Sequence, residues 1–334
     1  MSNNKITLPI DCVIAVTYKC NSRCVMCDIW KIKDASDLNL TDFTKLPSTL
    51  LDVNLSGGET FMHVDLPAIV SVVQKQCPRV RIVISSNGFM PDLIEKKMQE
   101  ILKIKSDIGI AISIDGIGEM HDKIRGIPGG YDKAMDTVKR LQKLGMTNLR
   151  LSFTILPENL KHLKLVYEES RKLGIQFTYT FAQSSDIYFG GKKMDNHPDL
   201  ISLKDQVGYV INRELHRLKP KSWVRAYFAY GLYQFVSKEK QILSNDPGSR
   251  FFFLDPKGDV YPSVVHNFKM GNIKDYKTWE ELWQSNEAET ARTNVKTKGQ
   301  PVWMICTART ALKKHPVKVG LWILKNMITG VKLK

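Results

Sequence analysis

The stretch Tyr18-Lys-Cys-Asn-Ser-Arg-Cys-Val-Met-Cys27 carries three cysteines, Cys20, Cys24 and Cys27, at C-x3-C-x2-C spacing. An apolar run, Val13–Val16, precedes it, so the cysteines are expected in a loop directly after a strand. Thiolates are the usual ligands of iron–sulfur clusters, and a cubane cluster normally takes four of them. Three thiolates would therefore leave one iron open to a substrate or a cofactor.

Other interpretations of the cysteines stay open on spacing alone. A structural zinc site takes four tetrahedral ligands, usually from paired motifs. The fourth would have to come from Cys12, Cys77 or a histidine, and none of these is part of a paired motif. The thiols could also be unrelated to one another. A disulfide framework is unexpected in a long chain without a secretory signal.

Length and composition indicate a globular α/β protein. The chain has 334 residues, enough for one large domain with an appendage, and 43% of them are hydrophobic. Six cysteines without a secretory signal favour a reducing cytoplasm, which also suits an oxygen-sensitive cluster. No run is long and apolar enough to span a bilayer.

The basic excess is concentrated at one end of the chain. Lys and Arg number 49 against 34 Asp and Glu, which gives a formal net charge of +15. No acidic residue follows Glu289, whereas ten basic residues do: Arg292, Lys296, Lys298, Arg309, Lys313, Lys314, Lys318, Lys325, Lys332 and Lys334. This asymmetry predicts contact with a polyanionic surface, either a membrane or a nucleic acid.

Apolar runs alternate with amphipathic stretches through the first half of the chain. The predicted strands are Asp11–Thr17, Asp52–Ser56, Val80–Ser86, Ile108–Ile114, Leu149–Ile155 and Gln176–Phe181. The predicted helices between them are Pro67–Gln76, Pro91–Lys103, Tyr131–Leu144 and Glu158–Leu173. Such alternation predicts a parallel sheet built from βαβ units.

The motifs after these strands resemble those of the radical S-adenosylmethionine (SAM) superfamily. Beyond the cysteine loop, they are Leu55-Ser-Gly-Gly-Glu-Thr60, Ser85-Ser-Asn-Gly88, Ile112-Ser-Ile-Asp-Gly116, His121-Asp and Arg125-Gly. The succession is similar to the branch that includes the molybdenum-cofactor cyclase and the peptide maturases with SPASM or twitch C-terminal domains. It implies a partial (β/α)6 TIM-like barrel, and in such barrels the active site lies at the C-terminal ends of the strands. The cysteines and the strand-end motifs fall at such ends.

The resemblance implies a cluster and a cofactor. The three cysteines would ligate one [4Fe–4S] cluster, whose fourth iron binds the amino and carboxylate groups of SAM. Glu59 would accept hydrogen bonds from the SAM ammonium group. Gly57 and Gly58 would let the backbone approach a ligand closely, although the two glycines could equally form a tight turn between strand and helix.

Further residues match positions that contact SAM in the family. Ser113 and Arg125 match contacts to the ribose and the carboxylate, and the planar fork of an arginine suits a carboxylate. Asn87 is a further candidate contact, and Asp115 could be a ribose contact or a turn residue. Met26 stands where the family usually has an aromatic residue near adenine, a place that a soft thioether can also fill.

The second half resembles a SPASM or twitch appendage without its auxiliary cluster. Phe251–Pro262 followed by Gly271-Asn-Ile resembles the hairpin and turn of that appendage. Its cysteines are absent, since Ser263 stands after Tyr-Pro and no cysteine lies near Gly248. The remaining thiol, Cys306, is expected to be a buried structural cysteine, with a role as hydrogen-atom donor to a substrate radical as the alternative.

The predicted division of the chain has four parts. These are a barrel at 1–185, a helical connecting region at 186–245 without recognisable chemistry, a SPASM/twitch-like subdomain at 246–310 and a basic amphipathic tail helix at 311–334. The connecting region is expected to contain helices at Ile201–Leu218 and Ala226–Leu243.

The tail from Val317 to Lys334 has the pattern of a membrane-interface helix. An apolar face is expected from Val317, Leu321, Leu324, Ile328 and Val331, with Trp322 at its border and lysines recurring every seven residues. Each lysine near an anionic leaflet adds roughly 1 kcal/mol of binding free energy. The alternative is a helix packed on the barrel with its lysine stems along the surface. Nucleic acid is disfavoured, because the basic residues interleave with aliphatic rather than stacking aromatic side chains.

The sequence therefore predicts a cytoplasmic radical SAM enzyme, peripheral on the inner face of the cell membrane. A reductant such as flavodoxin or ferredoxin would supply the electron that cleaves SAM, and the 5′-deoxyadenosyl radical would abstract hydrogen from a substrate. The first substrate hypothesis is a membrane-associated molecule, such as a lipid-linked sugar or another envelope precursor. A ribosomal peptide is second, weakened because no leader-binding module precedes the barrel, and RNA is third. A non-catalytic cluster scaffold or sensor is the alternative of another class.

Overall fold

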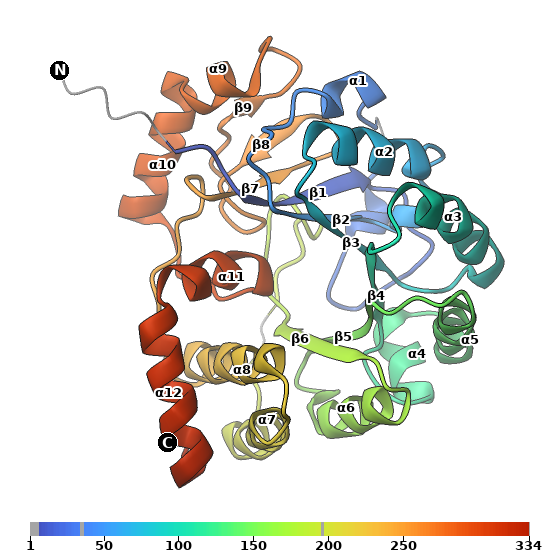
Figure 1. Cartoon of the computed structure of the whole chain (residues 1–334), viewed down its shortest axis with the longest axis vertical. Helices are drawn as coiled ribbons and strands as arrows, with labels where there is room; N and C mark the ends of the chain where they lie inside the picture. The colour runs from blue at the N-terminus through green and yellow to red at the C-terminus, as the bar shows by residue number, and fades with distance from the viewer. Residues whose placement is uncertain (1–6, 34–36, 195–196, 334) are drawn as a thin grey trace.

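One sheet runs through both halves of the chain (Figure 1). The computed structural model describes residues 7–33, 37–194 and 197–333. Within them the strand order is β6-β5-β4-β3-β2-β1-β7-β8-β9. The strands are β1 (Asp11–Thr17), β2 (Asp52–Gly57), β3 (Arg81–Ser86), β4 (Gly109–Ser113), β5 (Leu149–Ile155), β6 (Gln176–Phe181), β7 (Phe251–Leu254), β8 (Asp259–Tyr261) and β9 (Gly271–Asn272).

The first six strands are parallel and follow their order in the sequence, as predicted. All seven residues of β1 are buried, which is typical of a parallel strand covered on both faces. The sheet is open in the described residues, with β6 and β9 at its edges. An open parallel sheet is consistent with a partial barrel.

Helices follow the parallel strands and cover one side of them (Figure 1). They are α1 (Leu40–Phe43), α2 (Leu66–Gln76), α3 (Pro91–Ile104), α4 (Glu119–Arg125), α5 (Gly130–Lys143) and α6 (Leu163–Lys172), with short 3-10 helices at Ile29–Lys31, Thr60–Met62 and Leu160–His162. The longer helices match the predicted amphipathic stretches. The seven-residue α4 was not predicted, because two turns are too short for a clear apolar period.

The C-terminal half returns to the same sheet after two helices, α7 (Leu200–Leu215) and α8 (Pro220–Lys238). β7 pairs in parallel with β1, with Asp11 opposite Phe251, and β8 and β9 continue antiparallel. The remaining helices are α9 (Trp279–Trp283), α10 (Asn286–Lys298), α11 (Ile305–Lys314) and α12 (Pro316–Thr329). The boundary expected at 310–311 falls inside α11.

Helix α11 binds the carboxylates at the starts of β1 and β2. Arg309 Nε lies 2.9 Å from an Asp11 oxygen and its Nη1 lies 2.9 Å from an Asp52 oxygen, while Lys313 Nζ lies 2.8 Å from Asp52. Burial raises the pKa of Asp11 to about 7, against the opposing effect of Arg309. Arg309 and Lys313 therefore neutralise internal carboxylates, and the expectation that the whole C-terminal excess faces a polyanion is wrong for these two residues.

Helix α12 lies beside α8 and α7 at the margin of the molecule (Figure 1). It ends at Thr329, earlier than predicted, and Lys334 lies outside the described residues. Val331 follows the helix and is half-buried, so it does not belong to the apolar face expected for it. Across the described residues, we find no helix with both the length and the hydrophobicity needed to cross a bilayer.

Candidate active site

The cysteine loop opens on a cavity of about 230 Å³ at the C-terminal ends of the parallel strands. Most of the predicted site residues line it: Cys20, Cys24, Met26, Cys27, Gly57, Gly58, Asn87, Ser113 and Arg125. Glu59, Asp115 and Cys306 are buried and are not among its lining residues. Arg125 is the one charged side chain among the described residues that line the cavity.

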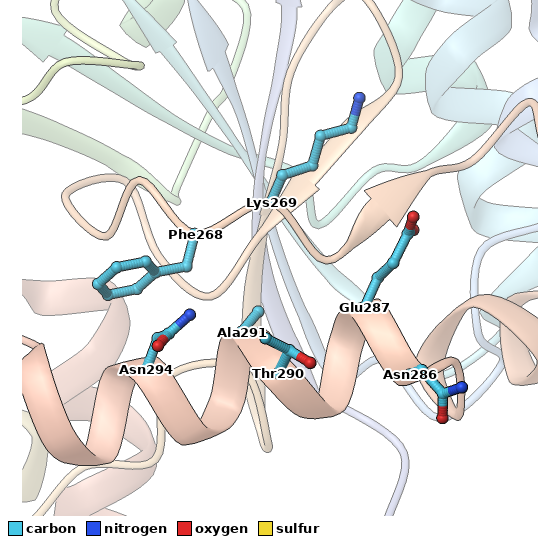
Figure 2. A pocket seen from close by; sticks show the side chains of 7 residues that line it. All are labelled: Phe268, Lys269, Asn286, Glu287, Thr290, Ala291 and Asn294. Atoms are coloured by element: carbon cyan, nitrogen blue, oxygen red, sulfur yellow. The ribbon is translucent and has the colours of Figure 1, made fainter.

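A larger groove of about 480 Å³ lies between α10 and the segment before β9 (Figure 2). Its charged side chains already have partners. Lys269 pairs with Asp259 at 2.7 Å, and the Tyr276 hydroxyl donates to Glu287 at 3.2 Å. The groove contains no cysteine or arginine. Chemistry rather than size therefore identifies the cysteine-lined cavity as the candidate site.

The C-terminus of α4 holds the cysteine loop in place. The last carbonyl groups of a helix have no partner within the helix, and here the loop supplies the donors. The backbone N–H of Arg23 donates to Arg125 O at 3.0 Å, and that of Val25 donates to Ile124 O at 2.9 Å. Gly126 ends the helix at φ +66°, and a Cβ there would lie 2.4 Å from Arg23 O. Only glycine fits this contact.

The thiols lie in surroundings that suit metal-bound thiolates. The Ser22 hydroxyl lies 3.0 Å from Cys24 Sγ, and Arg125 Nη1 donates to the same sulfur at 3.7 Å. Burial raises the pKa of both Cys20 and Cys27 to about 12, so these two are thiols without a metal. A coordinated metal removes such a proton outright.

The donor set fits a cluster better than a single metal ion. A zinc ion needs its ligands within about 2.3 Å of one point. In the part of the chain that the structure describes, no three His, Cys, Asp or Glu side chains are close enough together to hold one ion. The three thiols instead line one cavity from different positions of the loop, as ligands of a group with several metal atoms would.

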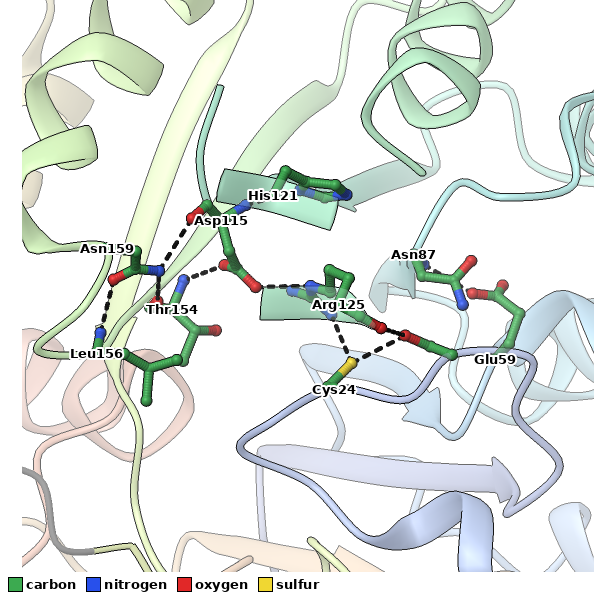
Figure 3. A network of polar contacts seen from close by, with 10 residues as sticks. Cys24, Glu59, Asn87, Asp115, His121, Arg125, Thr154, Leu156 and Asn159 are labelled. Atoms are coloured by element: carbon green, nitrogen blue, oxygen red, sulfur yellow. Dashed lines mark hydrogen bonds and ion pairs between the residues drawn. The ribbon is translucent and has the colours of Figure 1, made fainter. Parts of the chain in front are cut away.

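A buried ion pair connects Cys24 to the ends of two strands (Figure 3). Arg125 Nε lies 2.6 Å from Asp115 Oδ2, and the backbone N–H of Thr154 donates to Asp115 Oδ1 at 2.6 Å. The Asn159 amide donates to the backbone oxygens of Asp115 and Thr154. Asp115 follows β4 and Thr154 lies in β5, so Asp115 fixes Arg125 against the sheet. In this arrangement Asp115 orients Arg125 and is shielded from the cavity.

Glu59 is fully buried below the cavity and holds the loop after β3. Its Oε1 accepts hydrogen bonds from the Phe61 N–H at 3.1 Å and the Ser86 hydroxyl at 2.9 Å. Its Oε2 accepts from the Asn87 N–H at 2.7 Å. The expected contact with an ammonium group stays a prediction, because it requires this carboxylate to turn toward the cavity.

Gly57 and Gly58 allow a close approach, but to the chain itself. A Cβ on Gly57, which has φ +123°, would lie 2.3 Å from Thr17 O, and one on Gly58 would lie 2.2 Å from Lys19 O. Across the same contact, the Gly58 N–H donates to Thr17 O and the Glu59 N–H donates to Lys19 O, each at 2.8 Å. The two glycines thus allow the start of the cysteine loop to pack directly against the end of β2.

The region after β6 contributes cavity residues that sequence reasoning missed. Tyr188 and Phe189 line the cavity, although 186–245 was expected to carry no chemistry. The Tyr188 hydroxyl lies 2.5 Å from Ser56 Oγ, and its ring packs edge-on against Phe253 at 5.3 Å. The available signal was an aromatic pair before Gly190-Gly191, close behind the last parallel strand.

Cys306 lies in the first turn of α11, packed with Val302 in a buried cluster beside the cavity. It is 4% exposed, and burial raises its pKa to about 12. Met304, and not Cys306, is the residue of this segment that lines the cavity. These surroundings favour the structural interpretation of Cys306 over a direct hydrogen-atom donor.

Comparison with known families matches residues 14–169 to the radical SAM superfamily. These residues form a radical SAM domain. A second family model, named SPASM and described as an iron–sulfur cluster-binding domain, matches residues 247–308. The first range contains the cysteine loop and strands β2 to β5, and the second contains β7, β8 and β9.

The curated proteins similar to this chain have names that refer to different products. The antilisterial bacteriocin subtilosin biosynthesis protein AlbA of Bacillus subtilis is 24% identical over 85% of the chain and 61% of AlbA. The Fe-coproporphyrin III synthase of Methanosarcina barkeri is 30% identical over 46% of the chain and 39% of the synthase. The mycofactocin maturase MftC of Mycolicibacterium smegmatis is 24% identical over 84% and 71%. The chain thus spans less than two thirds of the length of the first two.

Solved structures share the fold at low sequence identity. Streptococcus suis SuiB bound to S-adenosylmethionine aligns with a TM-score of 0.66 at 15% identity, over 87% of this chain and 68% of SuiB. Native anSMEcpe with bound AdoMet and the Cp18Cys peptide aligns with a TM-score of 0.62 at 14% identity, over 97% of this chain and all of that one.

The SPASM-matched residues do not fit a cluster held by four cysteines. Cys306 is the single cysteine between residues 247 and 308, and an iron–sulfur cluster normally takes four thiolates. Ser263 Oγ lies 2.7 Å from His266 Nδ1, and His266 Nε2 lies 3.0 Å from Gln300 O. Polar contacts within the protein thus engage both of these buried side chains.

Proposed function

We propose that this chain is a radical SAM enzyme that holds one [4Fe–4S] cluster through Cys20, Cys24 and Cys27. The observation that carries the proposal is the convergence of three thiols from one loop on a cavity with a single charged lining residue, Arg125. When bound, the cluster and SAM supply an electron and a 5′-deoxyadenosyl radical, which removes a hydrogen atom from a C–H bond. The protein's own task is to position both partners and to exclude water.

The residues around the cavity have separate tasks in this proposal. Arg125 balances negative charge on the Cys24 side and offers its remaining N–H groups to the carboxylate of SAM. Ser113 and Asn87 offer polar contacts from neighbouring strand ends, while Met26 packs near the adenine. Tyr188 closes the cavity, with its hydroxyl held by Ser56.

For the substrate, we propose a membrane-associated organic molecule, such as a lipid-linked or envelope precursor, and a site of action on the inner face of the cell membrane. The basic residues from α12 onward support this proposal, because Lys318, Lys325 and Lys332 are exposed and no acidic residue follows Glu289. An external reductant of the flavodoxin or ferredoxin type would deliver the electron.

A ribosomal peptide is the second candidate substrate. It is favoured by the relatives whose names describe peptide products or maturation, among them AlbA and the sporulation killing factor maturation protein SkfB of Bacillus subtilis, which is 25% identical over half of the chain.

The test is anaerobic turnover of the reconstituted protein. With dithionite and SAM, mass spectrometry should detect 5′-deoxyadenosine, and a lipid fraction of the host cell should stimulate its formation. If soluble extract alone stimulates 5′-deoxyadenosine formation, the substrate is a peptide or a small metabolite and not a membrane-associated molecule. Absence of cleavage despite a complete cluster would favour the non-catalytic scaffold.

Matched cysteine variants test the ligand assignment. Cys27→Ala should abolish cleavage, whereas Cys77→Ala should retain it, because Cys77 is buried at the end of α2, where its thiol donates to Pro47 O at 3.3 Å. Iron and sulfide analysis should give about four of each per chain. About eight of each would contradict a single cluster.

A further inference from the structure

Helix α12 presents an apolar row to solvent. Val317 is 73% exposed, Leu321 is 64%, Leu324 is 60% and Ile328 is 85%. Their spacing of four, three and four residues places them on one face of a helix. Isolated exposed aliphatic residues are common, but a continuous row is typical of an interaction site.

The opposite face of α12 packs on the protein. Val319 and Ile323 are buried, and Trp322 packs against Tyr227 and Tyr230 with ring centroids 5.2 and 4.9 Å away. The helix therefore does pack on the rest of the molecule, but by a face other than the predicted apolar one. Trp322, expected at the border of that face, points inward.

Contacts at both ends fix the orientation of α12. Before the helix, Lys314 of α11 pairs with Asp246 at 3.0 Å. In its first turn, Lys318 Nζ donates to Ile242 O at 3.0 Å. After the helix, Leu333 is buried against α7, where a Cβ on Gly208 would lie 3.4 Å from it. The apolar row is thus already formed and oriented in the isolated chain.

The charges beside the row are basic. Lys318 and Lys325 are both exposed and follow Val317 and Leu324 in sequence, so they lie along one border of the row. No Asp or Glu occurs in α11, in α12 or in the residues that follow them. An aliphatic face with a lysine border complements the acyl chains and anionic headgroups at the surface of a bilayer.

We propose that α12 is a preformed docking helix for an anionic lipid bilayer. It lies parallel to the surface, with Val317, Leu321, Leu324 and Ile328 inserted and the lysines at headgroup level. This inference rests on the membrane location proposed above and names the surface that would make the contact. It does not depend on whether the chain cleaves SAM. Because the helix is already folded, docking adds no helicity, unlike the binding of a segment that folds on the membrane.

Flotation with lipid vesicles tests the docking. The cluster-loaded chain should float with vesicles that contain phosphatidylglycerol and much less with pure phosphatidylcholine vesicles. Leu321→Gln/Ile328→Gln keeps residues of good helix propensity and should lower vesicle affinity roughly a hundredfold, since it removes two inserted side chains. Ile201→Gln, at an exposed position of α7, is the matched control and should float like wild type.

Circular dichroism and sedimentation complete the test. Helicity should be the same with and without vesicles, and a large increase on binding would overturn the preformed helix. Equal flotation of wild type and the double variant would overturn the lipid face. If the wild type does not float but sediments as a dimer, and the double variant sediments as a monomer, the apolar row binds a second copy of the chain and the lipid proposal is overturned. Cleavage of SAM in buffer should be unchanged in the double variant, so failure of docking and failure of the proposed chemistry are distinguishable.

Discussion

The substitution Asp115→Asn leaves the buried Arg125 guanidinium without its counter-ion. Asp115 is fully buried, and Arg125 Nε lies 2.6 Å from its carboxylate. An asparagine oxygen can still accept the hydrogen bond from the Thr154 N–H. The substitution therefore removes mainly the ion pair with Arg125. Breaking a buried pair by removing one partner typically costs about 3–5 kcal/mol. For a protein of this size that corresponds to a decrease in Tm of about 4–7 °C.

The assay is urea and thermal unfolding of the cluster-free chain, so that metal loss does not confound stability. Asp92→Asn is the matched control, because Asp92 also pairs with an arginine, Arg140 at 2.7 Å, but its side chain is 90% exposed. An exposed pair contributes less than about 1 kcal/mol. If Asp115→Asn destabilises no more than Asp92→Asn, the ion pair does not hold Arg125 in place.

A double variant separates the charge from the packing. Arg125→Met alone leaves Asp115 buried, but burial raises the pKa of this carboxyl, so it can take up a proton and lose its charge. The combination Asp115→Asn/Arg125→Met should therefore be more stable than the sum of the single effects predicts, by about 1–3 kcal/mol. Additive effects would show that the two groups do not interact.

Three further predictions concern pH, the cysteine loop and α12. Burial, and then the charge of Arg125, lower the pKa of His121 to about 3, so the folded chain keeps it neutral. Its stabilising contribution is present above pH 6.5 and is lost at about 1.4 kcal/mol per pH unit as the pH falls from 6.5 toward 3. His121→Gln should flatten that part of a urea-derived stability profile, and an unchanged slope would contradict the assignment. Gly58→Ala places a Cβ 2.2 Å from Lys19 O and should reduce cluster iron to less than about half of the wild-type content; full iron content would mean that the loop can shift. Gly320→Ala, in α12 with nothing near its Cβ, should raise the free energy of unfolding by up to about 1 kcal/mol, and a decrease would show that α12 is not a stable helix.

The sequence predicts the parallel sheet well because its local signals agree with one another. β1, β5 and β6 have the predicted bounds, since β1 has an apolar centre and β5 and β6 alternate apolar with polar residues. The motifs lie at strand ends, and parallel strands bring those ends to one edge. Most of the candidate site residues therefore line one cavity.

The contacts of the charged groups could not be predicted, because they depend on residues far apart in the chain. Asp11 and Asp52 look like ordinary strand starts, yet Arg309 binds both from about 260 to 300 positions away. Glu59 occurs in the expected motif, but two of its partners, Ser86 and Asn87, come from the neighbouring strand end. For α12, the heptad pattern identifies an apolar face but not the direction in which it points, because the buried side is set by the tyrosines of α8.

The pairing of β7 with β1 makes the C-terminal unit a structural cover for the first strand. Four consecutive residues of β1, Asp11 to Ile14, pair with β7. A chain that ended before β7 would leave the N–H and C=O groups on the β7 side of this apolar strand unpaired, as an open edge that invites aggregation. We therefore expect the radical SAM-matched segment to aggregate more readily when it is expressed without β7. Evolution could lose cluster-binding cysteines from the C-terminal unit and still have reason to retain its strands.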